Sequence, residues 1–230
     1  MKYFSTLLIT IACILSGCSR NADKDNPTAA SATASASASD PQTSGQALPP
    51  HSAVEGIPLG EWTGAWWQWA DAAPEAVNDV AGTQCGLRQS GLVWFLAGSF
   101  SSGKMHRHCT VPQGKYIFFP IINSVMSSDE DKPTSCNDLM DQAKQMSNEP
   151  KNLHVTVDGK NVDNPVAYRE ASSKCFNLPA NVKQDEEATP TASNGYWIML
   201  RPFARGTHTI SFGGQLDDFS QDITYELAVE

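Results

Sequence analysis

The sequence predicts a mainly β fold, an antiparallel β-sandwich with two short helices. Between residues 56 and 230, short apolar or alternating runs recur with turn signals between them, a pattern typical of sandwiches and barrels. Only two segments space their apolar residues as a helix does. A parallel sheet, in which strands alternate with helices, would need more helices than this.

The first helix is predicted over residues 58–70. One apolar stripe runs along it at helical spacing, made of Leu59, Trp62, Trp66 and Trp69. A stripe of this kind normally faces the core. Trp67 lies off the stripe, so it either packs against a second surface or exposes its indole.

The second helix begins at Ser135, because Ser135 and Asp138 form a pair that resembles a capping box. Apolar residues then follow at helical spacing: Leu139, Ala143 and Met146.

Six segments are predicted as strands. Continuous apolar runs at 92–97 and 116–122 indicate strands buried on both faces, and Pro120 marks an edge or a bulge in the second. The remaining four segments have apolar residues on at least one face of a strand; they are 153–157 before the Asp158-Gly159 turn, 196–200, 207–212 and 223–229.

The first 18 residues have the pattern of an export signal. Lys2 precedes an apolar run, and the run ends in Leu15-Ser16-Gly17-Cys18. This end resembles the lipobox of bacterial lipoproteins, in which the signal peptide is removed before a cysteine that carries lipid. The resemblance implies a signal peptide over 1–17, lipid on Cys18 and, with Ser19 next, attachment to the outer membrane. The apolar run is too short to span a bilayer.

Residues 18–55 are expected to form a lipidated, disordered tether rich in serine and alanine, because the segment is poor in large apolar residues. Residues 56–230 then form the β-sandwich domain. The net charge is −9 and no basic cluster is present, which excludes a nucleic-acid partner. The expected membrane contact is the lipid anchor alone, and no cofactor is expected.

Besides Cys13 and Cys18 in the signal region, the chain has four cysteines, all in the predicted domain. An even number of cysteines in an exported domain predicts two disulfides. Three connectivities are possible. We favour Cys85–Cys109, which flanks one strand-rich unit, and Cys136–Cys175, which ties a helix start to a later loop. A four-cysteine zinc site is the rival, but the chain has no Cys-x2-Cys pair.

Several motifs together resemble a family of uncharacterised bacterial secreted proteins. They include WWxW at 66–69, GxVWFLAG at 91–98 and CTVPxGK at 109–115. The resemblance covers most of the domain and no part of the tether. It implies export and a compact β-rich domain, and it assigns no catalytic residue.

Two further features are candidate sites. His106 and His108 would share one face of a strand and could bind a metal, but the sequence identifies no third ligand. Trp67 is a candidate for stacking on a sugar ring or for contact with a protein partner. No catalytic residue is identified, since the chain lacks a G-x-S-x-G elbow, an H-E-x-x-H motif and a phosphate loop.

The sequence therefore predicts a lipid-anchored protein of the cell envelope, with its domain in the periplasm or at the cell surface. We expect it to be non-enzymatic and to bind a glycan, a peptidoglycan fragment or an envelope protein. One alternative is a periplasmic hydrolase with a dispersed active site. The other is an immunity protein that blocks a periplasmic toxin; the acidity of this chain would suit a basic toxin.

Overall fold

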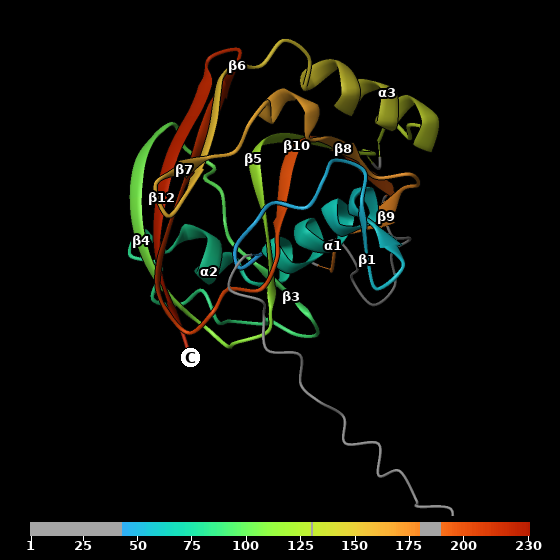
Figure 1. Cartoon of the computed structure of the whole chain (residues 1–230). Coiled ribbons are helices and arrows are strands. Elements are labelled where there is room, and N and C mark those ends of the chain that lie inside the picture. Colours follow the sequence, from blue (N-terminus) through green and yellow to red (C-terminus); the bar gives the residue numbers. More distant parts are fainter. Residues whose placement is uncertain (1–42, 130, 180–189) are drawn as a thin grey trace, which may run out of the picture. The chain divides into compact units, whose positions relative to one another are not determined.

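Two five-stranded sheets pack face to face, and helix α1 lies against the other side of one of them (Figure 1). The computed structural model describes residues 43–129, 131–179 and 190–230. In chain order the elements are β1 (Ala53–Val54), β2 (Ile57–Pro58), α1 (Leu59–Ala72), α2 (Pro74–Asn78), β3 (Val93–Phe95), β4 (Gly103–Val111), β5 (Tyr116–Ser127), α3 (Cys136–Met146), β6 (Lys151–Val157), β7 (Lys160–Asn161), a 3-10 turn (Pro165–Ala167), β8 (Arg169–Ala171), β9 (Phe176–Asn177), β10 (Pro190–Leu200), β11 (Gly206–Leu216) and β12 (Phe219–Val229).

The mainly β, sandwich-like fold is confirmed. One sheet, called the inner sheet below, has the order β3-β5-β10-β8, with β9 also paired to β10. The other, the outer sheet, has the order β4-β12-β11-β6-β7. Most pairings are antiparallel, as predicted, but β3 runs parallel to β5 and β4 runs parallel to β12.

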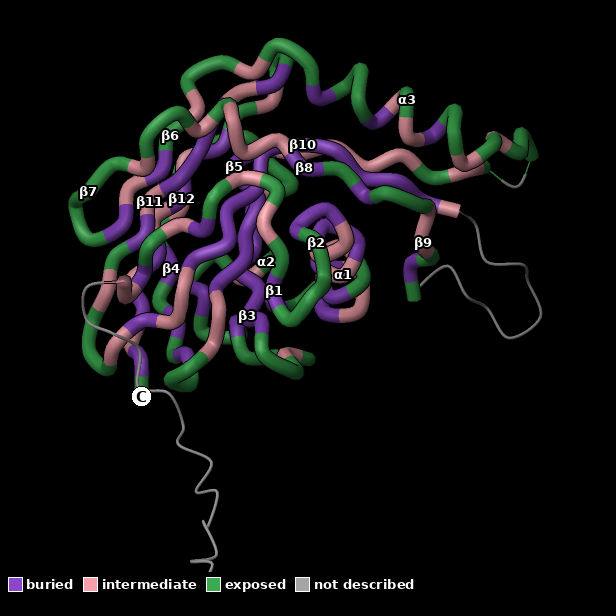
Figure 2. Tube along the Cα trace, turned by 45° about the vertical axis from the view of Figure 1, so that its right-hand side comes forward, coloured by how far each residue is buried: buried purple, intermediate pink, exposed green. Residues whose placement is uncertain are grey.

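The inner sheet is buried on both faces, and β10 is buried along nearly its whole length (Figure 2). On one face, the ring of Phe119 lies 4.4 Å from that of Phe212 in the outer sheet. On the other face, Phe118 and Trp197 stack at 5.3 Å, and Trp66 of α1 packs edge-on against Trp197 at 5.5 Å. These two apolar layers explain the continuous apolar runs in the sequence.

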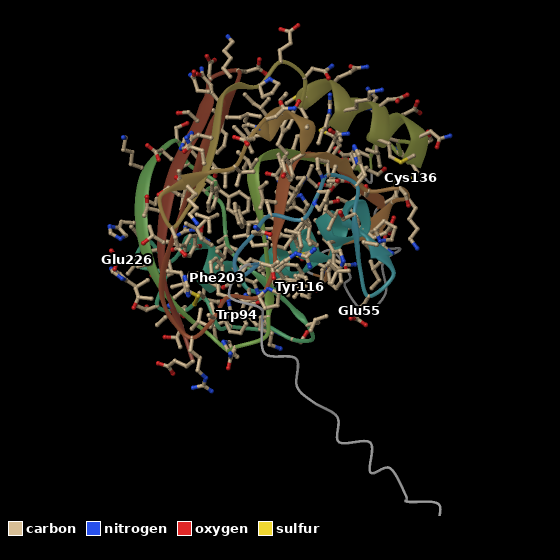
Figure 3. All side chains as sticks on the ribbon, viewed as in Figure 1. Glu55, Trp94, Tyr116, Cys136, Phe203 and Glu226 are labelled. Carbon is tan, nitrogen blue, oxygen red and sulfur yellow. A yellow bond between two sulfur atoms is a disulfide. The ribbon has the colours of Figure 1, made fainter. Side chains whose placement is uncertain are left out.

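Both predicted helices and both predicted disulfides are present. Helix α1 starts one residue later than expected, and α3 is capped by Ser135, whose hydroxyl accepts from the Asp138 amide at 3.2 Å. The disulfides are Cys85–Cys109 and Cys136–Cys175, with Cys136 labelled in Figure 3. The five-residue helix α2 is not predicted by the sequence pattern.

The ordered domain begins earlier than residue 56, which corrects the predicted end of the tether. Leu48 and Val54 are buried, and the Leu48 amide donates to the carbonyl of Met199 at 2.8 Å. Leu48 and Val54 are isolated apolar residues among small and polar neighbours and form no periodic pattern. Their packing could therefore not be predicted from the sequence. Residues 1–42, with the predicted signal peptide, Cys18 and most of the tether, lie outside the described residues.

Strand β4 is absent from the predicted elements because Arg107 occupies one of its inward-facing positions. The Arg107 side chain is only 1% exposed. Nη1 donates to the carbonyls of Ala97 and Gly98, both at 2.9 Å, and to the Tyr225 hydroxyl at 3.0 Å. Nη2 donates to the carbonyl of Val77 at 2.9 Å. A charge in the core is tolerated only when it is hydrogen-bonded in this way.

Replacing Arg107 with Met should lower the free energy of unfolding by about 3 kcal/mol or more, because the change leaves buried carbonyl acceptors without donors. Denaturant melts of the purified protein measure the effect. The control is Arg88→Met, at an exposed arginine, which should change the stability little. Equal stabilities of the two variants would contradict a structural role for Arg107.

Candidate ligand-binding pocket

A small pocket opens between helices α1 and α2, the segment that follows β3, strand β5 and the start of β12. Its volume is about 230 Å³. The lining residues come from five separate stretches of the sequence; they are Trp66, Trp67, Val77, Gly98, Ser99, Phe100, Pro120, Asn123, Phe219 and Gln221. Its volume is below the range of about 300–1,000 Å³ typical of sites for drug-sized ligands, so it suits a single ring or a chain end.

Trp67 and Phe100 form an aromatic wall of the pocket. Their ring centres lie 6.0 Å apart with planes tilted by 36°. Trp66 packs edge-on against Trp67, with their ring centres 5.1 Å apart. The Trp66 indole donates to the carbonyl of Leu96. Phe100 is 59% exposed, which is a large exposure for a phenylalanine. The wall therefore offers aromatic surface that the protein itself does not cover.

A β-bulge and Gln221 contribute a polar part of the lining. In the pairing of β10 with β5, Tyr196 faces Ile122 and Trp197 faces Pro120, so Ile121 is the extra residue of a bulge. The predicted irregularity at Pro120 is thus a bulge in a central strand. The Gln221 side chain donates to the carbonyl of Ile121 at 2.7 Å and accepts from the Ser99 amide at 2.8 Å.

Asn123 lies beyond the bulge and also lines the pocket. Its side-chain Nδ2 is buried and has no hydrogen-bond partner among the described residues. Gly195 faces it across the strand pair, where an added Cβ would come within 2.5 Å of the Asn123 Cα. A glycine there lets the two backbones approach closely and sets the position of the amide.

Arg107 and Tyr225 hold the segment that carries Gly98 and Phe100. Besides the contacts of Arg107, the Tyr225 hydroxyl donates to the carbonyl of Ala97 at 3.0 Å and accepts from the Ala97 amide at 3.1 Å. Burial raises the pKa of the Tyr225 phenol above its ordinary value, although Arg107 beside it acts in the opposite direction. The hydroxyl is therefore protonated at neutral pH and can donate.

Among the tryptophans singled out by sequence, Trp66 and Trp67 line this pocket. Trp66 and Trp69 are buried, and Trp62 is half-buried. Trp67 is half-buried too, and its indole donates to the Ser193 hydroxyl at 3.2 Å. Its predicted position off the apolar stripe agrees with this placement, and its role in recognition stays a prediction.

Phe100, Asn123 and Gln221 were not singled out as site residues by the sequence analysis. Phe100 is a lone aromatic in a serine-rich run, and that isolation was a usable signal of exposure. Asn123 and Gln221 carry no comparable signal, because only the pairing of distant strands brings them together. His106 and His108 lie elsewhere, on the exposed face of the outer sheet, and Cys18 lies outside the described residues.

No protein-family model and no curated protein matches this chain. Among solved structures, a chain from the structure of PbICP-C in complex with falcipain-2 matches at 6% sequence identity. The match covers 61% of this chain and 100% of that chain, with a TM-score of 0.26. A likeness this distant says nothing about the function of this chain.

Truncating the two neighbouring tryptophans should have unequal effects on stability. Trp66→Ala removes a fully enclosed side chain and should cost about 3–5 kcal/mol. Trp67→Ala should cost clearly less, because one side of that indole faces the pocket. Thermal or denaturant unfolding of both variants tests this, and an equal loss would show that Trp67 acts as core.

Proposed function

We propose that this chain is a lipid-anchored protein of the cell envelope that binds a glycan, such as a peptidoglycan fragment, in the pocket at Trp67. The pairing of an uncovered aromatic wall with an unpaired buried amide carries the proposal. Each half matches one part of a sugar.

The aromatic half suits the apolar face of a sugar ring. Pyranose rings expose C–H bonds on one face, and an indole or phenyl ring can pack flat against them, burying area that both partners otherwise expose to water. Trp67 is held by Trp66 and Ser193. Little side-chain freedom is therefore lost when a ligand binds it.

The amide half suits a carbonyl or hydroxyl acceptor. Asn123 Nδ2 is a donor, and a buried donor without a partner costs about 1–3 kcal/mol. The acetamido carbonyl of an amino sugar is one group that could satisfy it. The neighbouring Gln221 already uses its amide on the protein. Asn123 is therefore the better candidate to recognise ligand.

Binding is favoured over hydrolysis by the lining itself. Among the described residues that line the pocket, none carries a carboxyl, imidazole, amine or thiol group. Glycoside hydrolysis commonly needs a pair of carboxyl groups flanking the scissile bond. The pocket as lined offers no group for general acid or base catalysis.

The envelope location rests on the lipobox-like sequence at 15–18. Three acyl chains on Cys18 would give a lasting attachment, since one chain alone binds only marginally. In the described part of the chain, no helix has the length and apolar character needed to cross a membrane.

Trp67→Ala and Phe100→Ala should each weaken binding to soluble peptidoglycan fragments by about tenfold, which corresponds to about 1.4 kcal/mol. The loss of stacking area is the cause. Titration calorimetry on the purified full chain in detergent measures the affinity. Asn123→Ala should weaken binding as well, because it removes the amide donor.

The matched control is Val166→Ala, which truncates an exposed apolar residue outside the pocket lining. It should bind as the unaltered protein does. Unchanged affinity in both aromatic variants would contradict the proposed site. Release of new reducing ends by the unaltered protein would favour the hydrolase instead.

Cys18→Ser should abolish labelling by radioactive palmitate and leave the unprocessed precursor in cells, because lipidation normally precedes cleavage. The matched control is Cys13→Ser, which alters the other cysteine of the signal region and should be labelled normally. Labelled Cys18→Ser protein would refute the anchor.

A further inference from the structure

A second cluster of polar side chains lies on the exposed face of the outer sheet. His106 and His108 are two residues apart in β4, so they share this face. β12 pairs with β4 in parallel and places Glu226 directly beside His108. Figure 3 shows Glu226 pointing outward from this sheet. The three side chains converge although the sequence separates the histidines from the glutamate by more than 100 residues.

Both histidines already pair with Glu226, at separations close to those between two ligand atoms on one metal ion. His106 Nε2 lies 3.0 Å from Glu226 Oε1, and His108 Nδ1 lies 3.3 Å from Glu226 Oε2. One ligand atom from each of the three residues can be chosen so that all lie within 4.8 Å of one another. A tetrahedral zinc ion with bonds of about 2.0–2.1 Å needs ligand atoms about 3.4 Å apart. Small side-chain rotations therefore suffice to admit an ion.

The cluster is open on its outer side. The side chains of His106, His108 and Glu226 are 56%, 63% and 44% exposed. His108 and Glu226 also line a cleft of about 580 Å³ beside the Cys85–Cys109 disulfide. Three protein ligands beside open space leave a fourth coordination position for water or another donor, as in open zinc sites.

We propose that His106, His108 and Glu226 bind a divalent transition-metal ion of the zinc type. Two imidazoles and one carboxylate favour zinc, copper or nickel over calcium and magnesium, which prefer oxygen ligands throughout. The ligands stand on two hydrogen-bonded strands, so the backbone fixes their spacing. The site is separate from the Trp67 pocket and does not depend on glycan binding.

Titration of the purified full chain with zinc chloride tests the site, using calorimetry and a preparation without a polyhistidine tag. The unaltered protein should bind one equivalent. His106→Ala and Glu226→Gln should each weaken binding by at least about tenfold, since even residues that only hydrogen-bond to a metal's ligands contribute about 10–100-fold to the affinity. X-ray absorption of the zinc-loaded protein should show nitrogen and oxygen neighbours at about 2.0–2.1 Å.

The matched control is His154→Ala. His154 is also an exposed histidine of the outer sheet and also contacts a carboxylate of β12, Asp222, at 3.6 Å. It should keep full zinc affinity. The proposal is overturned if the unaltered protein binds no zinc at micromolar concentrations, or if His154→Ala lowers the affinity as much as His106→Ala does. Because the substituted histidines are exposed and Glu226 is only partly buried, circular dichroism should show intact folds.

Discussion

Arg107 carries a positive charge into the interior, where its side chain is almost completely shielded from water. Its hydrogen bonds within the described part of the chain go to backbone carbonyls, a tyrosine hydroxyl and a methionine sulfur. A buried charge is tolerated only if such partners surround it. The end of α2, the segment after β3 and strand β12 must therefore all converge on one guanidinium.

The pocket depends on this convergence. Arg107 and Tyr225 hold Ala97 and Gly98 from the inside, and the chain then emerges as Ser99 and Phe100. Gln221 joins the emerging segment to the bulge of β5. The aromatic and polar walls are thus tied to the core before any ligand arrives, and a site held in this way loses little freedom on binding.

Features that depend on local pattern were predictable from sequence. Continuous apolar runs identified β3 and β5 of the inner sheet, and the tryptophan stripe identified α1. The disulfide pairs were favoured by local position, Cys85 and Cys109 flanking a strand-rich unit and Cys136 standing at a helix start. Features that depend on distant pairing were not. Arg107 interrupts the alternation of β4 and hid that strand, and Glu226 became a neighbour of His108 only through a parallel pairing. Leu48 packs on the sheet with no pattern around it.

The parallel pair of β4 and β12 connects the two candidate sites. Along β4, Arg107 points inward and its neighbours His106 and His108 point outward; along β12, Tyr225 points inward and Glu226 outward. A slip of one strand by a single residue would exchange its two faces, placing a histidine or a glutamate in the core. The register that satisfies the buried guanidinium is therefore the same register that brings two imidazoles and a carboxylate together outside. Burial of Arg107 thereby specifies the geometry of the outer cluster, although it touches none of its side chains.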